Sequence, residues 1–355
     1  MSILNAAFAF ACDSKPVSYA EFGSGHINNT YIIETNSRKR YVLQRINDYV
    51  FKKPEEVMAN VGAVTRYLLE NNKGTYTALH YLQTREGLYY HKDSRGNYWR
   101  MYEFVPGICL DTPQRDEDLY QSALAFGKFQ NLLKDFPAET LYETIPNFHN
   151  TIDRYEQFKA SVQADAVGRV DAATAEIAQL MKWEKMAGTL EQMKEAGELP
   201  LRVTHNDTKL NNVLLDRYTH ENICVLDLDT VMPGLSLYDF GDAIRFGAST
   251  AMEDETDLSK VSLDLHLFEV YAKGYLEAVP SLTENEIRML PMGALIMTIE
   301  VAVRFLKDYL DGDLYFKIRK PDHNLIRAQN QIALACDMER KLPQMMRIIE
   351  ELRRK

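Results

Sequence analysis

Strand-like segments are concentrated in the first hundred residues of this 355-residue chain, and helix-like segments fill most of the remainder. Residues 30–35 and 40–45 are rich in β-branched and aromatic side chains and flank a short polar turn, which predicts a hairpin. Apolar residues at helical spacing predict a helix over about 54–69. Two further strands are expected over 87–91 and 98–105. This order favours a small lobe built from a sheet and one helix.

Helices are expected to dominate beyond Pro106 and Gly107, a pair that typically ends a regular segment. Apolar residues recur there at helical spacing over 116–136, 151–164, 171–196, 262–279, 284–311 and 324–352. In 202–229, by contrast, short strand-like runs alternate with polar turns. The patterns predict an α+β protein with a β-rich N-lobe over residues 1–105 and a larger helical C-lobe over residues 106–355.

Composition excludes several classes of partner. The formal net charge of −10 disfavours a nucleic acid or an anionic membrane and suits a soluble protein or a cationic ligand. The four cysteines lie too far apart for a metal or redox motif, which is typical of reduced thiols in a cytosolic protein. The apolar start over 3–11 has no preceding Lys or Arg, so we expect a short packed helix there and not a signal segment. We predict a cytoplasmic protein without membrane or nucleic-acid partners.

A possible catalytic loop lies at residues 205–212, which fit the pattern H-x-D-x-x-x-x-N. Phosphoryl transfer needs an acceptor for the proton of the attacking hydroxyl, and Asp207 can provide it. Asn212 can turn its amide oxygen towards a metal ion, and Asp227 follows a predicted strand where a Mg²⁺ ligand is needed. The alternative is a loop of Asx turns with an ordinary acid pair after it. The order and separation of the three residues favour phosphoryl transfer.

Asp239-Phe240-Gly241 has the spelling of the D-F-G motif of protein kinases. It follows a turn and lies well downstream of the loop, whereas Asp227 directly follows a strand. We therefore interpret Asp239 as a cap or a support for the catalytic loop.

A glycine-containing turn lies between the first two predicted strands. At Gly23, Ser24 and Gly25 the backbone N–H groups could approach phosphate without a large side chain in the way. The alternative is an ordinary hairpin turn. His26 is unusual in a phosphate loop, and it is either an exposed turn residue or a substrate contact.

The cation that holds the nucleotide phosphates is harder to assign. Gln44 occupies the strand position of the protein-kinase lysine, and Arg45 follows it. Adjacent strand residues face opposite ways, so Arg45 can serve only with a bulge or a different register. Nearby, Tyr102 and Phe104 could pack an adenine ring, although strand aromatics more often belong to a core.

Two polar features stand out in the predicted helical lobe. Arg304 is flanked by apolar residues, which is typical of a buried ion-pair partner or of a ligand contact. A polar cluster over 308–316 follows it and includes Tyr315.

The loop at 205–212, the strand before Asp227 and the small first lobe together resemble the aminoglycoside phosphotransferase/choline kinase-like family, whose fold is two-lobed and protein-kinase-like. The resemblance narrows to the N-acetylhexosamine 1-kinase group over 25–28, 41–45, 201–212, 239–242, 245–251, 253–255, 257–260 and 308–310.

This resemblance implies ATP and Mg²⁺ as cofactors and an N-acetylhexosamine as the substrate, which is phosphorylated on its C1 hydroxyl. By the same resemblance, Asp207 is the catalytic carboxylate beside the sugar, and Asn212 and Asp227 hold Mg²⁺. It also places His26, Arg304 and Tyr315 against the sugar. Many members of the broader family have an acid after the glycine of the metal-site loop, but Leu235 follows Gly234 here, which suggests a differently shaped acceptor side.

Two alternatives remain at this stage. One keeps the fold and changes the acceptor to an aminoglycoside, choline or homoserine. The other is a non-catalytic nucleotide-binding module, which the presence of Asp207, Asn212 and Asp227 together disfavours.

Overall fold

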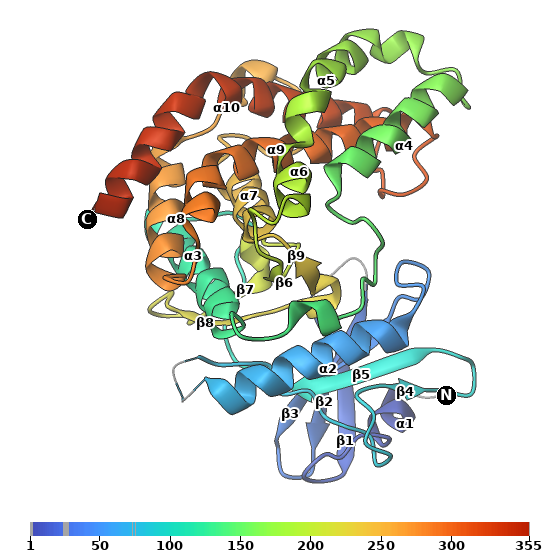
Figure 1. Cartoon of the computed structure of the whole chain (residues 1–355). Coiled ribbons are helices and arrows are strands. Elements are labelled where there is room, and N and C mark those ends of the chain that lie inside the picture. Colours follow the sequence, from blue (N-terminus) through green and yellow to red (C-terminus); the bar gives the residue numbers. More distant parts are fainter. Residues whose placement is uncertain (1–2, 24–27, 73, 75, 355) are drawn as a thin grey trace.

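A five-stranded antiparallel sheet forms one end of the molecule in the computed structural model, which describes residues 3–23, 28–72, 74 and 76–354 (Figure 1). Its strand order is β1-β2-β3-β5-β4. The strands are β1 (Pro16–Glu21), β2 (Asn29–Thr35), β3 (Arg40–Ile46), β4 (His91–Lys92) and β5 (Tyr98–Glu103). The predicted hairpin is confirmed, since β2 and β3 pair in one continuous register.

The two faces of the sheet carry different cores because successive strand residues point to opposite sides. Tyr41, Leu43 and Met101 pack with α1 (Ile3–Ala7), the short packed helix expected at the start of the chain. On the other face Ile46 and Tyr98 pack with α2 (Pro54–Asn71). Figure 1 shows α2 between the sheet and the helical end of the molecule.

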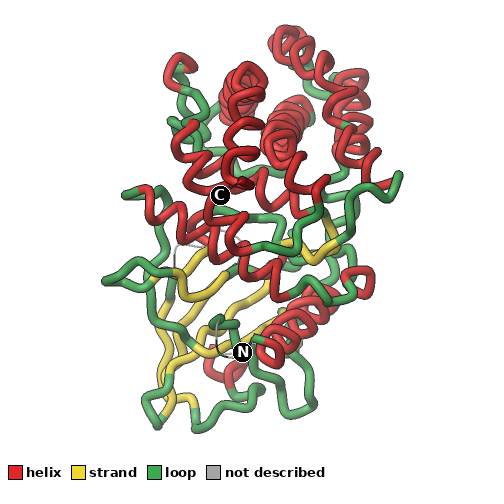
Figure 2. The backbone as a smooth tube through the Cα atoms, turned by 60° about the vertical axis from the view of Figure 1, so that its left-hand side comes forward, coloured by secondary structure: helices red, strands yellow, loops and turns green. Residues whose placement is uncertain are grey.

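The helical end is built from eight α-helices among the described residues: α3 (Asp116–Leu132), α4 (Thr151–Ala164), α5 (Thr174–Ala187), α6 (Thr189–Glu195), α7 (Ser236–Gly247), α8 (Leu265–Ala278), α9 (Glu284–Leu310) and α10 (His323–Arg354). Figure 2 shows the helices gathered at one end of the molecule and the main sheet at the other. The α+β prediction is confirmed. By length and composition α9 could span a membrane, but 83% of its apolar window is buried inside the protein, so it is the core helix of this end.

Two small two-stranded sheets lie in the segment that was expected to interrupt the helices. β6 (Arg202–Thr204) pairs with β9 (Met232–Gly234), and β7 (Val213–Leu215) pairs with β8 (Asn222–Val225). The loops between these strands contain both the catalytic-loop motif and Asp227. The position of the site is therefore set by four short strands.

The predictions were wrong in two places. The strand expected over 87–91 is found only as β4, because Tyr89 leaves the sheet to pack on α2 beside Gly62. A Cβ added at Gly62 would come within 2.4 Å of the Tyr89 ring, so the small residue makes room for this contact. The helix expected over 171–196 is divided into α5 and α6 at Gly188, which caps the first of them.

Candidate active site

The catalytic loop follows β6 and is tied to the end of β8. His205 is fully buried, and its Nε2 lies 2.8 Å from the carbonyl oxygen of Leu226. Asn206 has a left-handed backbone with φ of 64°, a conformation that Asn tolerates better than most residues. Its side chain donates to the carbonyl oxygen of Thr230 at 2.8 Å, which fixes this turn. The turn is followed by Asp207, whose side chain is 28% exposed.

Asp239 anchors the backbone of the catalytic loop. It lies in the first turn of α7 and is completely buried. Its carboxylate accepts the backbone N–H groups of His205 and Asn206 at 2.9 and 2.7 Å, and the side-chain amide of Gln130 at 2.7 Å. Burial raises the pKa of Asp239, whereas His205 and these donors oppose the rise. The predicted support role is confirmed, and the D-F-G spelling is a coincidence.

Asp207 is surrounded by polar partners from its own loop. The side-chain nitrogen of Asn212 donates to the Asp207 carbonyl at 2.8 Å and to its carboxylate at 3.1 Å. Because this nitrogen is committed, the amide oxygen of Asn212 is the atom left for a cation. Lys209 lies 2.7 Å from the other carboxylate oxygen of Asp207. The sequence prediction missed Lys209, although a basic residue two positions after Asp207 could have indicated it.

Asp227 lies beside this loop because the backbone N–H of Leu226 donates to the carbonyl oxygen of Asn212 at 2.8 Å. Its own backbone is left-handed, and the residue is exposed at the surface. Partial loss of hydration against the surrounding protein, followed by the negative charges of Asp229 and Asp207, raises the pKa of Asp227 to about 7. A cation placed here would relieve this repulsion.

The oxygen ligands of this site suit Mg²⁺. Asp227 and the amide oxygen of Asn212 are the hard donors that Mg²⁺ prefers, and Mg²⁺ completes its shell with phosphate oxygens and water. Within the described ranges, no three His, Cys, Asp or Glu side chains form a metal-binding cluster by themselves. The two oxygen donors, from Asp227 and Asn212, fit a Mg²⁺ ion.

A buried arginine links the sheet to the metal-site loop, which contains Asp227 and Asp229. Arg100 on β5 is 1% exposed, forms an ion pair with Asp229, and donates from Nε to Gln44 at 2.9 Å. Asp229 also accepts the side-chain amide of Asn28 at 2.7 Å, so the base of the glycine-containing turn reaches the same carboxylate.

This arrangement corrects the assignment of Arg45. The β3–β5 register is continuous and places Gln44 opposite Arg100, so the adjacent Arg45 points to the other face and is exposed. Arg100 is the cation next to the metal-site loop. In the sequence, Arg100 has the same feature as Arg304, because both are charged residues between large apolar neighbours.

Tyr102 and Phe104, two of the residues predicted to contact the nucleotide, lie on the same side of the sheet as Arg100. Tyr102 packs against Tyr81, with ring centroids 5.0 Å apart. The ring centroid of Phe104 lies 5.9 Å from that of Phe22 and 4.1 Å from the guanidinium carbon of Arg40. Gly23 begins the turn with φ of 80°, which favours glycine. Ser24, Gly25 and His26 lie outside the described residues.

Arg304 and Tyr315, two of the predicted acceptor contacts, lie near the same ring, that of Phe316. The guanidinium of Arg304, on α9, stands over the rings of Phe148 and Phe316, at 4.9 and 5.7 Å from their centroids. Tyr315 is 63% exposed, and its ring lies 4.8 Å from that of Phe316. His149, next to Phe148, brings this group to the catalytic loop, since its Nε2 lies 3.4 Å from the carbonyl oxygen of Asn206.

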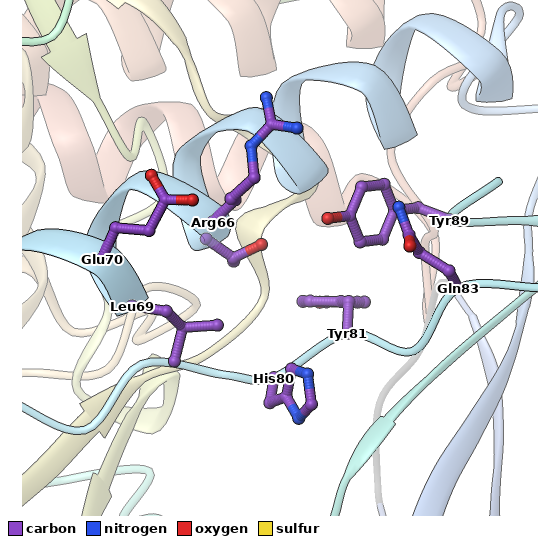
Figure 3. Close-up of a pocket in the computed structure, with 8 residues that line it drawn as sticks. Arg66, Leu69, Glu70, His80, Tyr81, Gln83 and Tyr89 are labelled. Atoms are coloured by element: carbon purple, nitrogen blue, oxygen red, sulfur yellow. The ribbon is translucent and has the colours of Figure 1, made fainter. Parts of the chain in front are cut away.

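A cavity borders the sheet face of Tyr102 and Arg100, because one of its lining residues is Tyr81. It has a volume of about 290 Å³ and is lined by Thr65, Arg66, Leu69, Glu70, His80, Tyr81, Gln83 and Tyr89. Figure 3 shows the side chains of α2 facing those of the segment that runs beside β5. None of the predicted site residues lines it, and Tyr81 connects it to Tyr102.

Comparison with known proteins agrees with this geometry. The family model described as phosphotransferase enzyme family matches residues 18–268. An aminoglycoside phosphotransferase from Alicyclobacillus acidocaldarius has a similar structure, with a TM-score of 0.67 and 12% identity over 99% of this chain and 97% of that chain. A microcompartment-associated aminopropanol kinase matches with a TM-score of 0.62 and 17% identity over 96% and 97% of the two chains.

An amicoumacin kinase in complex with AMP-PNP, Ca²⁺ and its antibiotic also matches, with a TM-score of 0.59 and 13% identity over 98% of this chain and 92% of that chain. At these identities the similarity shows a shared kinase-like fold, and it leaves the acceptor of the present chain to be argued from its own residues.

Proposed function

The chain belongs to the phosphotransferase enzyme family, and from this premise we propose that it is an ATP-dependent kinase acting on the C1 hydroxyl of N-acetylhexosamines. N-acetylglucosamine and N-acetylgalactosamine are the proposed acceptors, and the sugar 1-phosphate is the product. The observation that carries the proposal is the position of Asp207, next to Asn212, Lys209 and Asp227 on a loop that Asp239 fixes from behind. We place the enzyme in the cytoplasm, where ATP is available.

In the proposed reaction Asp207 accepts the proton of the C1 hydroxyl as the sugar oxygen bonds to the γ-phosphorus and the bond to ADP breaks. Lys209 lies close enough to Asp207 to steady its charge and to face the phosphoryl group in transfer. Asn212 and Asp227 would hold Mg²⁺, which neutralises phosphate charge when it is bound. The fixed loop positions these groups before substrate arrives, so little reorganisation is needed.

On the nucleotide side, we place the triphosphate beneath the turn that contains Gly23, Ser24 and Gly25, with the adenine near Tyr102 and Phe104. The lobe over residues 1–105 would hold ATP, and the lobe over 106–355 would supply the loop and the acceptor site. Support comes from the common sheet face of Tyr102, Phe104 and Arg100.

On the acceptor side, we propose that Arg304, Tyr315 and His26 bind the sugar together with Asp207. The packing of Arg304 and Tyr315 on Phe316, close to the catalytic loop, supports the first two. A second arginine, Arg154, lies near Arg304, whose positive charge adds to the effect of burial in lowering the pKa of Arg154. Two guanidinium groups at this wall favour a neutral or anionic acceptor.

The second candidate is a kinase of the same fold with a cationic acceptor, such as an aminoglycoside, choline or an amino alcohol. The similarity to an aminopropanol kinase favours it at the level of the fold. The arginine-rich wall argues against it, because choline sites commonly use aromatic cages and an aminoglycoside needs acidic partners.

The test is an acceptor panel. The protein is incubated with ATP, Mg²⁺ and N-acetylglucosamine, N-acetylgalactosamine, glucose, galactose, choline or an aminoglycoside, and the products are examined by ³¹P and ¹H NMR. Phosphate on C1 of the N-acetylhexosamines, absent with the Asp207→Asn variant, is the expected result. Turnover of choline or of an aminoglycoside, with none on the sugars, would replace this proposal by the second candidate.

A further inference from the structure

Helix α9 carries a polar stripe on an otherwise apolar surface. Glu300, Arg304 and Asp308 are spaced four residues apart, so they lie on one face of the helix. Glu300 is 0% exposed and Asp308 is 4% exposed. Figure 1 shows α9 running through the middle of the helical end, with α4, α7 and α10 around it. Charged groups at such positions are costly unless they are paired, so each calls for an explanation.

Asp308 has a clear structural role. Its carboxylate accepts the backbone N–H groups of Leu314, Tyr315 and Phe316 at 2.9, 2.7 and 2.9 Å. It also accepts the side-chain amide of Asn324 at 2.9 Å. The carboxylate therefore fastens the segment that carries Tyr315 and Phe316 to α9.

Glu300 is not satisfied in the same way. One carboxylate oxygen, Oε1, lies 2.9 Å from Nδ1 of His149 and 3.6 Å from the guanidinium of Arg304. The other, Oε2, is buried without a hydrogen-bond partner among the described residues. A buried carboxylate with an unused oxygen contributes less to stability than its burial costs. We therefore explain the charge of Glu300 by its electrostatic effect on the charged side chains around it.

Besides His149, the charge of Glu300 acts on two arginines, Arg304 and Arg154. Arg154 is fixed, because it donates twice to the carbonyl oxygen of Phe148, at 3.1 and 2.8 Å. Burial and then the charge of Arg304 lower the pKa of Arg154, so the two guanidinium groups repel each other. The charge of Glu300 opposes this repulsion. Without it, Arg304 would be the group to move, since it has no such pair of bonds to a carbonyl among the described residues.

We propose that Glu300 is a positioning residue that holds Arg304 over Phe148 and Phe316 and thereby sets the affinity for the acceptor. The proposal rests on the acceptor role of Arg304 given above. The ligand class it implies is an acceptor with a neutral or anionic oxygen turned towards Arg304. Glu300 itself is too deeply buried to touch the acceptor, so it acts through Arg304.

The testing variant is Glu300→Gln, which keeps the shape of the side chain and removes the charge. Its amide oxygen can still accept from Nδ1 of His149, so this contact is retained. We expect the KM for the acceptor to rise about tenfold, with kcat and the KM for ATP within about twofold of wild type. Thermal stabilisation of the protein by the acceptor alone should shrink in parallel.

A matched control lies on the same helix. Glu286 is equally buried and pairs with Arg202, in the first turn of α9 and 18 residues before Arg304. Glu286→Gln should lower the melting temperature and leave the KM for the acceptor unchanged. A double-mutant cycle completes the test, because Glu300→Gln combined with Arg304→Ala should raise the KM no further than Arg304→Ala alone.

Several outcomes would overturn the inference. They are an unchanged acceptor KM in Glu300→Gln, an equal rise in both KM values, a fall in kcat alone, or additive effects in the double variant. The experiment uses whichever acceptor the wild-type protein phosphorylates. Failure of the proposed sugar specificity therefore shows in the wild-type panel, and failure of the positioning role shows only in the variants.

Discussion

Replacement of Asp239 by asparagine distinguishes two roles for the aspartate of the D-F-G sequence. One is support of the catalytic loop, and the other is binding of a metal ion. In the structure the Asp239 carboxylate accepts two backbone N–H groups of the catalytic loop and one side-chain amide. All three partners are donors. An asparagine at this position would offer only one accepting oxygen, and its NH₂ group would face a donor.

The expected loss of stability follows from those contacts. A hydrogen bond to a charged group contributes about 1.5–3 kcal/mol, and a buried donor left without a partner costs a similar amount. Asp239→Asn loses at least one accepted hydrogen bond and weakens the others, so the free energy of unfolding should fall by about 3 kcal/mol. For 355 residues with an unfolding entropy of about 2.1 cal/mol/K per residue, the melting temperature should fall by about 4 °C.

The assay combines denaturant unfolding with turnover and nucleotide binding. We expect kcat to fall because the loop that carries Asp207 loses its support, while Mg²⁺-dependent binding of ADP stays close to wild type. Asp337→Asn is the control, because Asp337 also accepts a backbone N–H, from Leu263 at 2.8 Å, but lies away from the catalytic loop. It should lose stability and keep kcat. Unchanged stability of Asp239→Asn with a large loss of Mg²⁺ affinity would refute the support role.

Four further predictions concern the site itself. Asp207→Asn should abolish turnover and leave ATP binding nearly intact by calorimetry; lost binding would contradict its role as proton acceptor. Arg304→Ala should raise the KM for the acceptor far more than that for ATP, and equal changes would remove it from the acceptor site. Arg100→Met should destabilise the protein by about 3–5 kcal/mol in urea unfolding, because Asp229 would lose its buried partner, and adding Asp229→Asn should recover part of the loss. The fourth prediction concerns the metal-free protein. Because the pKa of Asp227 is raised to about 7 in the folded chain, the folded chain keeps a proton that the unfolded chain has released, and the free energy of unfolding should fall as the pH rises from 3.8 towards about 7. The Asp227→Asn substitution, or saturating Mg²⁺ with nucleotide, should reduce this dependence on pH.

The parts of the fold that could be predicted from the sequence are those with local causes. The β2–β3 hairpin and helix α2 follow from side-chain alternation and helical spacing within one segment. Tyr89 shows where this fails, because its place is set by the gap that Gly62 leaves on another element. Nothing in the sequence around Tyr89 distinguishes a strand residue from one that packs on a helix.

The same distinction holds for the site. The proximity of Asp207, Asn212 and Asp227 could be predicted, because the loop at 205–212 and the strand after it are close in sequence. Arg100 and Glu300 could not, because their partners Asp229 and His149 lie far away along the chain. Pairing of this kind is fixed by tertiary structure, and the sequence shows only a charged residue among apolar ones.

The two sides of the site are held by different kinds of contact, and substrate binding should reflect the difference. On the proposed acceptor side, Arg304 and Asp308, which anchors Tyr315, project from one long buried helix, so their separation is fixed by the helix itself. On the proposed nucleotide side, the sheet reaches the loop of Asp227 through the carboxylate of Asp229, which accepts from both Asn28 and Arg100. Any movement of the sheet relative to the helices must therefore change the surroundings of Asp227, two residues before Asp229, whereas the acceptor wall can stay in place. Nucleotide affinity should accordingly depend on the position of the sheet, and acceptor affinity on the charges along α9.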